Sequence, residues 1–283
     1  MKIIKNELSL VKKIIFERSK NNKIHFVPTM GSIHRGHREL IKSSQKKDTI
    51  TIVSIFLNKL QFNDRKDYEN YPSDLNYDLS LLKKLSVNYV FVPNPKKFIN
   101  QDFSSFVRVK KYEGVLCDKL RGEHFQGVST IITKFLIIIK PDYIYLGEKD
   151  FQQMLVIKKL IKDLHFGTKV FVKKTIREKD GLAYSSRNLM LSVTQRKIAS
   201  QIYKSLKELK KICNEKRYDL STIQSIKYRL KKIGLKVNYL EILKEHNLKT
   251  IDSESCKYRA FISVNIKNIN LIDNLSLGTI KFY

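Results

Sequence analysis

Cysteine is scarce in this chain, and its placement excludes two classes of cross-linked protein. The 283 residues contain three cysteines, Cys117, Cys213 and Cys256. An odd number of widely spaced cysteines, without a CxxC pair, indicates neither a disulfide framework nor a zinc site. We therefore expect ordinary thiols and a fold that depends on a hydrophobic core, which a chain of this length can bury.

Long hydrophobic runs are also missing. The most apolar stretch, Ile131 to Ile139, is too short to cross a bilayer and is interrupted by Thr133 and Lys134. The N-terminus, Met1 to Glu7, has neither the apolar region nor the cleavage site of a signal peptide. These absences predict a soluble, cytoplasmic protein with no membrane partner.

Acidic residues are few: 27 Asp and Glu stand against 55 Lys and Arg, which gives a formal net charge of +28. Such a charge normally indicates nucleic acid or an anionic membrane as a partner. Here the lysines are spread over every segment, and a bias toward Lys, Ile and Asn also arises when coding sequence drifts toward A and T. We therefore expect no nucleic-acid partner, although the positive potential helps to attract anionic substrates.

The sequence does contain apolar runs that end in glycine or polar residues. The run from Ile24 to Thr29 leads through a turn with Gly31 into an amphipathic segment that begins near Gly36. This pattern predicts a buried strand, a turn and a helix. In a parallel α/β sheet the turn lies outside the carboxyl ends of the strands, where ligands bind.

This turn carries groups suited to a phosphate. Gly31 and Gly36 let the backbone approach closely, and the N–H groups at a helix start favour an anion. His34 and His37 can donate hydrogen bonds to phosphoryl oxygens without the fixed charge of lysine. The residues alone leave open that two surface histidines simply follow the turn.

A second predicted strand ends in neutral amides. Thr49 to Leu57 is a β-branched run typical of a strand buried on both faces, and Asn58 and Gln61 follow it. Amides suit a hydroxy acid because they donate to a carboxylate and accept from a hydroxyl. Ordinary loop amides are the alternative.

A further predicted strand, Tyr143 to Leu146, runs into glycine and charged residues. Gly147 permits close approach of a ribose or base, and Lys149 is a mobile cation that can reach phosphate. Asp150 lies where a helix cap belongs. Later in the chain, Ser185, Ser186 and Arg187 make a compact anion grip, because a guanidinium binds two oxygens at once.

The pattern changes in the last third of the chain. Lysine-rich helical segments from Thr194 to about Asn214 and from about Ser221 to Ile233 precede short strands, without a catalytic constellation. We expect an α/β fold, a doubly wound parallel sheet, in residues 1–176. A smaller α+β domain is expected in residues 177–283, and Lys179-Asp180-Gly181 near its start is typical of a turn.

Four strings of the sequence resemble those of the pantoate–β-alanine ligase family, in the nucleotidyltransferase superfamily with its HxGH motif. The strings, in the family's order, are VPTMGSIHRGH (27–37), SIFLNKLQF (54–62), GEKDFQQ (147–153) and SSRN (185–188). Tyr184 departs from the family, which more often has Leu there, and two further departures occur. Lys59 stands where the family usually has Pro, and Gly122-Glu123 replaces Pro-Gly between Arg121 and His124.

The resemblance implies a Rossmann-like fold that binds nucleotide and pantoate in residues 1–176. It also implies a C-terminal lid domain in residues 177–283 with its hinge near Asp180 and Gly181, and an ATP-dependent ligase that joins pantoate to β-alanine. Pantoate would attack the α-phosphate of MgATP to give pantoyl adenylate and pyrophosphate, and β-alanine would then release AMP. The implied catalytic residues are His34, His37, Lys149 and Arg187, with His37 as the proton donor. The implied residues for pantoate and β-alanine are Asn58, Gln61, Arg121 and Gln153. The implied ATP-binding residues are Met30, Gly31, Ser32, Ile33, His34, Arg35, Gly36, His37, Gly147, Glu148, Lys149, Asp150, Ile176, Tyr184, Ser185, Ser186 and Arg187.

Other features stay open or rest on the resemblance alone. The family is homodimeric, so a homodimer is expected. Arg121 either pairs with a substrate carboxylate or is solvated. The acidic residues that follow the candidate cap Ser73 either complement the helix dipole, as Asp74 does in the first turn, or meet Mg²⁺. The resemblance makes Asp78 the better candidate for the ion, whose ligands the sequence does not predict.

Two other functions are alternatives. A nucleotidyltransferase with a different acceptor would share HxGH but should lack the QF and FQQ strings. A basic RNA-binding module would explain the charge but not the phosphate-loop chemistry.

Overall fold

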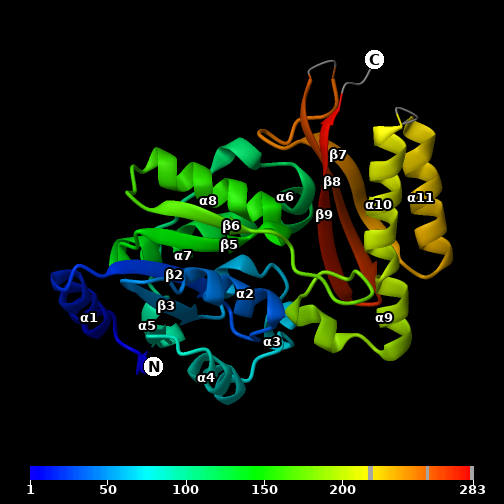
Figure 1. Cartoon of the computed structure of the whole chain (residues 1–283). Coiled ribbons are helices and arrows are strands. Elements are labelled where there is room, and N and C mark those ends of the chain that lie inside the picture. The colour runs from blue at the N-terminus through cyan, green and yellow to red at the C-terminus, as the bar shows by residue number, and fades with distance from the viewer. Residues whose placement is uncertain (216–218, 253–254, 281–283) are drawn as a thin grey trace. The chain divides into compact units, whose positions relative to one another are not determined.

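The chain forms two compact units (Figure 1). The computed structural model describes residues 1–215, 219–252 and 255–280. The first unit contains residues 1–110, 121–148 and 153–174, and the second contains residues 111–120, 149–152 and the chain from residue 175 onward. The single domain boundary at 176/177 stays a prediction, and it does not anticipate the two short segments that group with the second unit.

A parallel sheet forms the centre of the first unit. Its described strands are β1 (Lys2–Ile4), β2 (Lys23–Thr29), β3 (Thr49–Ile55), β4 (Tyr89–Phe91), β5 (Tyr143–Gly147) and β6 (Lys169–Lys173). They are ordered β1-β4-β3-β2-β5-β6, and all neighbours are parallel. Because parallel strands need crossover connections, helices alternate with them. The predicted α/β fold with a doubly wound parallel sheet is confirmed.

Helices pack on both faces of this sheet. The described helices as far as residue 163 are α1 (Glu7–Ser19), α2 (Arg35–Ser44), α3 (Arg65–Glu69), α4 (Leu75–Lys84), α5 (Pro95–Phe98), α6 (Leu116–Arg121), α7 (His124–Ile139) and α8 (Phe151–Asp163). Val27 of β2 packs in a buried cluster with Ile41 of α2 and Leu82 of α4. Its neighbour Phe26 lies 5.3 Å, between ring centroids, from Phe135 of α7. Successive strand residues point to opposite faces, so β2 is buried on both.

The direction in which strands are added to the sheet changes between β2 and β5, which makes this place the topological switch point. The chain passes from β2 to β3 and β4 on one side, and later forms β5 and β6 on the other side. In open α/β sheets, ligands bind outside the carboxyl ends of the strands at such a point. The turns after Thr29 of β2 and Gly147 of β5 are therefore the places where this fold positions a site.

The alternation of residue types from Ser105 to Lys110 is typical of a short strand, but a strand expected there on that basis is wrong. These residues form no strand in the structure and lead into a 3-10 turn, Lys110–Tyr112. Val107 N donates to the side-chain oxygen of Thr130 at 3.0 Å. A side-chain partner on α7 therefore takes the place of a neighbouring strand.

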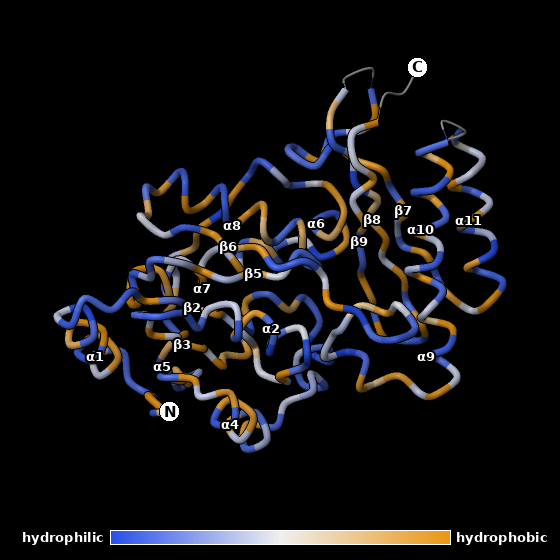
Figure 2. The backbone as a smooth tube through the Cα atoms, in the orientation of Figure 1, coloured by the Kyte–Doolittle hydropathy of each residue, from blue (hydrophilic) through white to orange (hydrophobic). Residues whose placement is uncertain are grey.

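The second unit is a smaller α+β structure, as expected. Its described elements from residue 193 onward are α9 (Val193–Ala199), α10 (Gln201–Asn214), α11 (Leu220–Lys232), and the antiparallel strands β7 (Lys236–Lys244), β8 (Cys256–Ile266) and β9 (Ile269–Ile280). Figure 2 shows hydrophobic and hydrophilic residues alternating along α10 and α11. The buried residues Leu206 and Leu209 of α10 belong to one core with Ile262 and Val264 of β8.

Candidate functional site

A buried carboxylate shapes the turn after β2. Gly31 has a φ of +88°, and an added Cβ would lie 2.9 Å from Asp78 Oδ2. Ser32 N donates to Asp78 Oδ2 and Ile33 N donates to Asp78 Oδ1, both at 2.7 Å. Asp78 is 1% exposed, and burial raises the pKa of its carboxyl. Both oxygens hold the turn, so these contacts assign Asp78 a task that neither sequence-based alternative foresaw.

His34 and His37 stack at the start of α2. Their ring centroids lie 3.9 Å apart, with 21° between the ring planes. Gly36 N donates to His34 Nδ1 at 3.1 Å, and His34 N donates to His37 Nδ1 at 3.4 Å. An Nδ1 that accepts an N–H carries no proton, so each neutral ring has its proton on Nε2. The cap of α2 therefore sets both rings as Nε2–H donors beside the helix N-terminus.

The loop after β3 is a 3-10 turn, Lys59–Gln61, built around Asn58. Leu60 N donates to Asn58 Oδ1 at 3.2 Å, and Asn58 Nδ2 donates to Gln61 Oε1 at 3.1 Å. Asn58 is 1% exposed. Gln61 is half-buried, and its Nε2 lies 3.1 Å from the sulfur of Met30, in the turn after β2. The amide of Asn58 thus holds Gln61, which lies beside the predicted ATP-binding turn.

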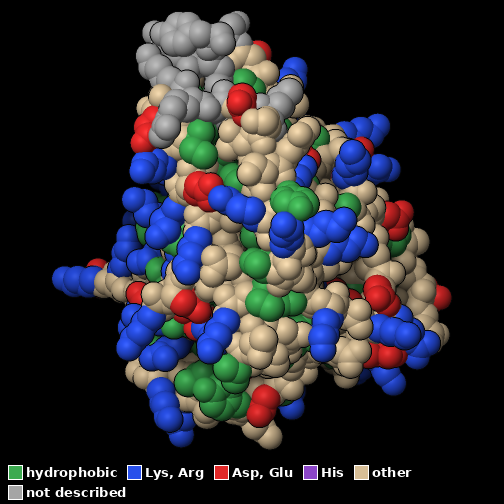
Figure 3. Space-filling view, turned by 90° about the vertical axis from the view of Figure 1, so that its right-hand side faces the viewer, with side chains coloured by type: hydrophobic (Ala, Val, Ile, Leu, Met, Phe, Trp, Pro, Cys, Tyr) green, Lys and Arg blue, Asp and Glu red, His purple; other side chains and the backbone are tan. Residues whose placement is uncertain are grey.

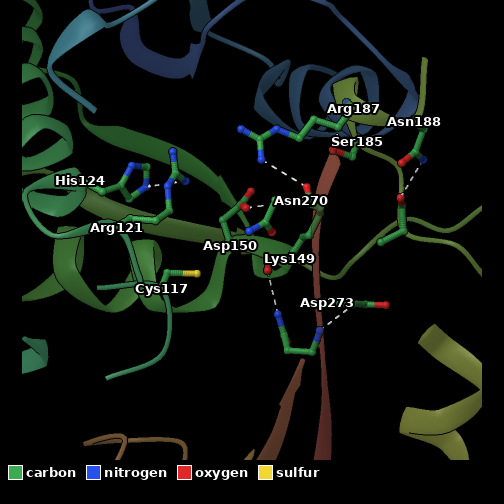
Figure 4. Close-up of polar contacts among 12 residues, drawn as sticks. Cys117, Arg121, His124, Lys149, Asp150, Ser185, Arg187, Asn188, Asn270 and Asp273 are labelled. Carbon is green, nitrogen blue, oxygen red and sulfur yellow. Dashed lines mark hydrogen bonds and ion pairs between the residues drawn. The ribbon is translucent and has the colours of Figure 1, made fainter. Parts of the chain in front are cut away.

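An arginine and a histidine meet on the backbone of this loop. Arg121 Nη2 donates to the carbonyl oxygen of Gln61 at 3.2 Å, and His124 Nδ1 lies 2.7 Å from the same oxygen. Figure 4 shows the Arg121 and His124 side chains side by side, with 3.4 Å between Arg121 Nη1 and His124 Nε2. Gly122 adopts a φ of +45° between them. The altered Gly122-Glu123 turn therefore still presents both side chains to one carbonyl.

Helix α7 touches the same loop through a glycine. A Cβ added at Gly127 would lie 2.2 Å from the backbone oxygen of Leu60. Asn58 Nδ2 also donates to the carbonyl oxygen of Gly127 at 3.1 Å. The close approach explains why this helical position carries a glycine despite the cost to helix stability.

The chain after β5 contributes a lysine to the second unit. Gly147 and Glu148 belong to the first unit, whereas Lys149 and Asp150 group with the second. Lys149 Nζ lies 3.3 Å from Asp150 Oδ1, and the Lys149 side chain is 18% exposed. The ammonium is thus partly desolvated and oriented by a neighbouring carboxylate. Asp150, predicted as a cap, ends a 3-10 turn, Glu148–Asp150, and directly precedes Phe151, the first residue of α8.

Ile176 and Tyr184 lie opposite each other in a tight hairpin. Tyr184 N donates to the carbonyl oxygen of Ile176 at 3.0 Å, and Arg177 forms a bridge with Ala183. The predicted turn around Gly181 closes the hairpin, with a φ of +93° at this residue. Two predicted ATP-binding residues that are separated in sequence are therefore neighbours.

The SSRN string forms a 3-10 turn, Ser186–Met190, capped by Ser185. Arg187 N donates to Ser185 Oγ at 3.3 Å, and Arg187 Nη1 donates to the carbonyl oxygen of Asn270 at 3.2 Å. Asn188 Nδ2 donates to Glu178 Oε1 at 2.9 Å and to the carbonyl oxygen of Ala183. The turn is thus anchored to the hairpin before it, and Arg187 is oriented by β9 (Figure 4).

Sequence reasoning missed the task of two polar residues in the middle of β9, Asp273 and Asn274. Asp273 accepts two hydrogen bonds from Arg177, at 2.6 and 3.0 Å, and burial raises the pKa of its carboxyl against the effect of Arg177. Asn274 Nδ2 donates to the backbone oxygen of Lys149 at 2.8 Å. Asp273 also lines a small cavity together with Lys149 and Ser185. Two buried polar residues in an apolar strand were the available signal.

Of the two glutamines in FQQ, the buried one has a structural task. Gln152 Nε2 donates to the backbone oxygens of Tyr112 and Val115, and Cys117 N donates to Gln152 Oε1 at 3.1 Å. Gln153, the residue predicted to hold pantoate, is half-buried on α8 in the first unit.

The predicted residues fall into two assembled groups. His34, His37, Gln61 and Arg121 lie in the first unit with the turn after β2, and the second unit brings Lys149 together with the Ile176–Arg187 hairpin and turn. Within the described residues, no group of three or more His, Cys, Asp or Glu side chains could hold a metal ion. Figure 3 shows Lys and Arg scattered over the face in view, with acids among them, as expected for a diffuse charge.

Comparison with known proteins gives consistent similarities. A family model described as Pantoate-beta-alanine ligase matches residues 2–276. A curated "Pantothenate synthetase" of Thermosipho africanus is 40% identical over 280 residues, covering 97% of this chain and 99% of the relative. One from Endomicrobium trichonymphae is 42% identical, covering 98% of each.

Solved structures agree over the same length. Pantothenate synthetase from Thermus thermophilus has a TM-score of 0.91 at 30% identity, covering 98% of this chain and 100% of that one. Pantoate-beta-alanine ligase from Francisella tularensis, complexed with "Beta-gamma ATP" and beta-alanine, has a TM-score of 0.83 at 34% identity, covering 98% of each. In the part of the chain that the structure describes, no helix is both long and apolar enough to cross a membrane.

Proposed function

This chain belongs to the pantoate-beta-alanine ligase family, and we propose that both groups of site residues act on MgATP. It is an ATP-dependent ligase that condenses pantoate with β-alanine to pantothenate through pantoyl adenylate, with release of AMP and pyrophosphate. The assignment of residues to these steps is the proposal. The observation that carries it is the stacked histidine pair, which offers Nε2–H donors at the helix N-terminus beside the switch point.

We propose that His34 and His37 stabilise the first transition state. When the pantoate carboxylate attacks the α-phosphorus, negative charge spreads over the phosphoryl oxygens, and catalysis depends on positioning and charge stabilisation. Donors fixed in advance do this without reorganisation at the moment of reaction. The backbone N–H groups that occupy both Nδ1 atoms provide this fixation. His37 donates a hydrogen bond from its Nε2–H to a phosphoryl oxygen and keeps the proton, because the attacking carboxylate and the departing pyrophosphate need no proton from the ring.

Lys149 and Arg187 act on the departing pyrophosphate. Lys149 offers a compact ammonium, and Arg187 offers a guanidinium that binds two oxygens of one phosphate. Hydrogen bonds with Asn274 and Asn270 hold the Lys149 backbone and the Arg187 side chain. Mg²⁺ enters with ATP, whose phosphate oxygens are the ligands that this ion prefers. The remaining ATP contacts come from the turn after β2, Gly147, Glu148 and the Ile176–Tyr184 pair.

Gln61 and Gln153 hold pantoate and β-alanine in this proposal. Their amides suit the carboxylate and hydroxyl groups of pantoate. Asn58 and Arg121 act indirectly, since the amide of Asn58 is engaged inside the loop and Arg121 holds the Gln61 carbonyl. This replaces the expectation that both touch substrate.

The oligomeric state and the cellular location proposed for the protein rest on its family. We propose a homodimer that works in the cytoplasm without a nucleic-acid or membrane partner, on the basis of the family relationship. Light scattering of the purified protein tests the dimer, for which a single monomeric mass is the contrary result.

Pyrophosphate release tests the reaction order. The purified chain should release pyrophosphate from MgATP in the presence of pantoate and in the absence of β-alanine. AMP and pantothenate should appear only when β-alanine is added. Pyrophosphate release that does not depend on pantoate would mean that a different substrate accepts the adenylyl group.

A further inference from the structure

The backbone of Lys149 is held by a side chain that lies 125 positions away. Asn274 of β9 donates from Nδ2 to the Lys149 carbonyl oxygen at 2.8 Å. Asn274 is 4% exposed, and its other amide end is also engaged, because Arg259 Nη1 donates to Asn274 Oδ1 at 2.6 Å. An amide with both ends occupied in a buried place has one orientation. The hydrogen bond to Lys149 is therefore fixed in direction.

The arginine behind Asn274 is itself fixed. Arg259 is 4% exposed, and its guanidinium meets Glu245 Oε1 through Nε at 3.1 Å and Nη2 at 3.0 Å. The guanidinium carbon also lies 4.1 Å from the ring centroid of Phe151. A planar guanidinium held by a carboxylate and an aromatic face has little rotational freedom. The order Glu245, Arg259, Asn274, Lys149 is therefore a continuous chain of contacts within the second unit.

A second set of contacts holds Asn274 through its backbone. Asn274 N donates to Asp273 Oδ1 at 2.7 Å, and Arg177 Nη2 donates to the Asn274 carbonyl oxygen at 3.3 Å. Arg177 and Asp273 also form a bidentate pair. The side-chain contacts and the backbone contacts meet at Asn274. This residue therefore links the C-terminal sheet to the backbone of Lys149.

We propose that Asn274 is a positioning residue for Lys149 in ATP binding, an inference that rests on the proposed role of Lys149. A lysine side chain has many rotamers, so its ammonium is well placed only when its backbone is fixed. Asp150 restrains the ammonium end at 3.3 Å, and Asn274 restrains the backbone end. Misplacement of a binding group by about 1 Å can cost about a hundredfold in rate.

The substitution Asn274→Asp separates this role from simple support of the fold. Aspartate keeps an oxygen for Arg259, so the buried guanidinium stays paired. It loses the N–H donor and sets a carboxylate oxygen against the Lys149 carbonyl. Asn274→Ala removes both contacts and leaves the buried Arg259 with one fewer acceptor. Its effect therefore reports the stability of the fold and not the position of Lys149 alone. Asn247→Asp is the matched control, because it adds the same charge in the same unit and keeps the oxygen that accepts from Lys249 N.

Calorimetry with MgATP alone, without turnover, provides the main measurement. Asn274→Asp should weaken ATP binding at least about tenfold, while pantoate affinity stays close to that of Asn247→Asp. The melting temperature should fall somewhat below that of the control, because the buried Lys149 carbonyl loses its donor. In steady-state assays, KM for ATP should rise and KM for pantoate should not. ATP affinity equal to that of the control overturns the proposal, as does a parallel loss of ATP and pantoate binding. Loss of pantoate-dependent pyrophosphate release in the parent protein would count against the proposed function instead, and the ATP affinities would still decide the role of Asn274.

Discussion

The turn after β2 and the polar pair Asp273–Asn274 of β9 are both held by buried hydrogen bonds, but of different kinds. In the turn, one carboxylate, Asp78, receives two backbone N–H groups and needs no cation. At β9, Asp273 and Asn274 are tied to the charged side chains of Arg177 and Arg259. Backbone donors are present wherever the chain turns, whereas charged partners must be brought from distant positions. We call the Asp78 hydrogen bonds the first device and the contacts of Asp273 and Asn274 with arginines the second device. The first needs only backbone groups of one turn, whereas the second forms only once the C-terminal sheet has assembled.

Removing Asp273 should have the largest effect on stability and would show how far the second device depends on charge. Asp273→Asn leaves the largely buried Arg177 without its counter-ion, which typically costs about 3–5 kcal/mol. Urea unfolding followed by circular dichroism measures the loss. The double variant Asp273→Asn with Arg177→Met is the control and should recover part of the stability. Equal stability of the parent and the single variant would mean that the pair contributes nothing.

Removing the His37 ring should have the largest effect on chemistry and tests the first device. His37→Ala should fold but lose adenylate formation by about a hundredfold or more, the usual effect of removing one fixed donor or general acid. His37→Asn is the control for the helix cap, since its side-chain oxygen can still accept from His34 N. Pantoate-dependent pyrophosphate release reports the rate. Unchanged turnover in His37→Ala would remove His37 from the mechanism.

Substituting Asp78 should cost less than substituting Asp273. Asp78→Asn opposes one of the two N–H donors of the turn with its own amide, and an unsatisfied buried donor costs about 1–3 kcal/mol. Urea unfolding under the same conditions measures the loss. If this loss exceeded that of Asp273→Asn, the ranking of the two devices would be reversed.

The same variant has a pH signature. The pKa of the Asp78 carboxyl is raised above its ordinary value of 3.8 in the folded chain. Between the ordinary and the raised value the folded chain binds more protons than the unfolded chain, so the free energy of unfolding falls as pH rises through this window. Asp78→Asn should remove that part of the fall. Urea unfolding of both proteins from about pH 3 upward, in steps of about 0.5 pH unit, gives the slope of the unfolding free energy against pH for each protein. Identical slopes in both proteins would contradict the shift.

Arg121 should give the smallest effect. Because His124 contacts the same Gln61 carbonyl, Arg121→Gln should raise KM for pantoate by about two- to fivefold and leave kcat unchanged. Steady-state kinetics with pantoate as the varied substrate measure this. A loss of about a hundredfold would instead support the sequence-based alternative, a direct pair between Arg121 and a substrate carboxylate.

Features encoded within a few residues were predictable. The strand, turn and helix around Gly31 follow from hydrophobic period and glycine placement, and the spacing of His34 and His37 puts both rings on one helix turn. The hairpin around Gly181 follows from turn chemistry. Resemblance to a known family supplied the reaction, which the residues alone left open.

Features that depend on remote partners were not predictable. Nothing near Asn58 indicates that its amide is consumed by Gln61 and Gly127, and nothing near Asn274 indicates Lys149 as a partner. A side chain's hydrogen bonds are decided by which segments pack beside it, and a single sequence does not state this. Asp78 illustrates the point, because its buried contacts lie 45 and 46 positions away.

The grouping of residues 149–152 with the C-terminal sheet limits how this protein can be dissected. A recombinant piece that starts at residue 177 would lack Phe151, the ring against which Arg259 rests, and the carbonyl that Asn274 satisfies. It would also lack Ile176, the hairpin partner of Tyr184. Such a piece would expose apolar surface and carry unsatisfied polar atoms, so it should aggregate when expressed alone. A peptide spanning residues 143–163, supplied in trans, would restore Phe151 and the Lys149 carbonyl but not Ile176.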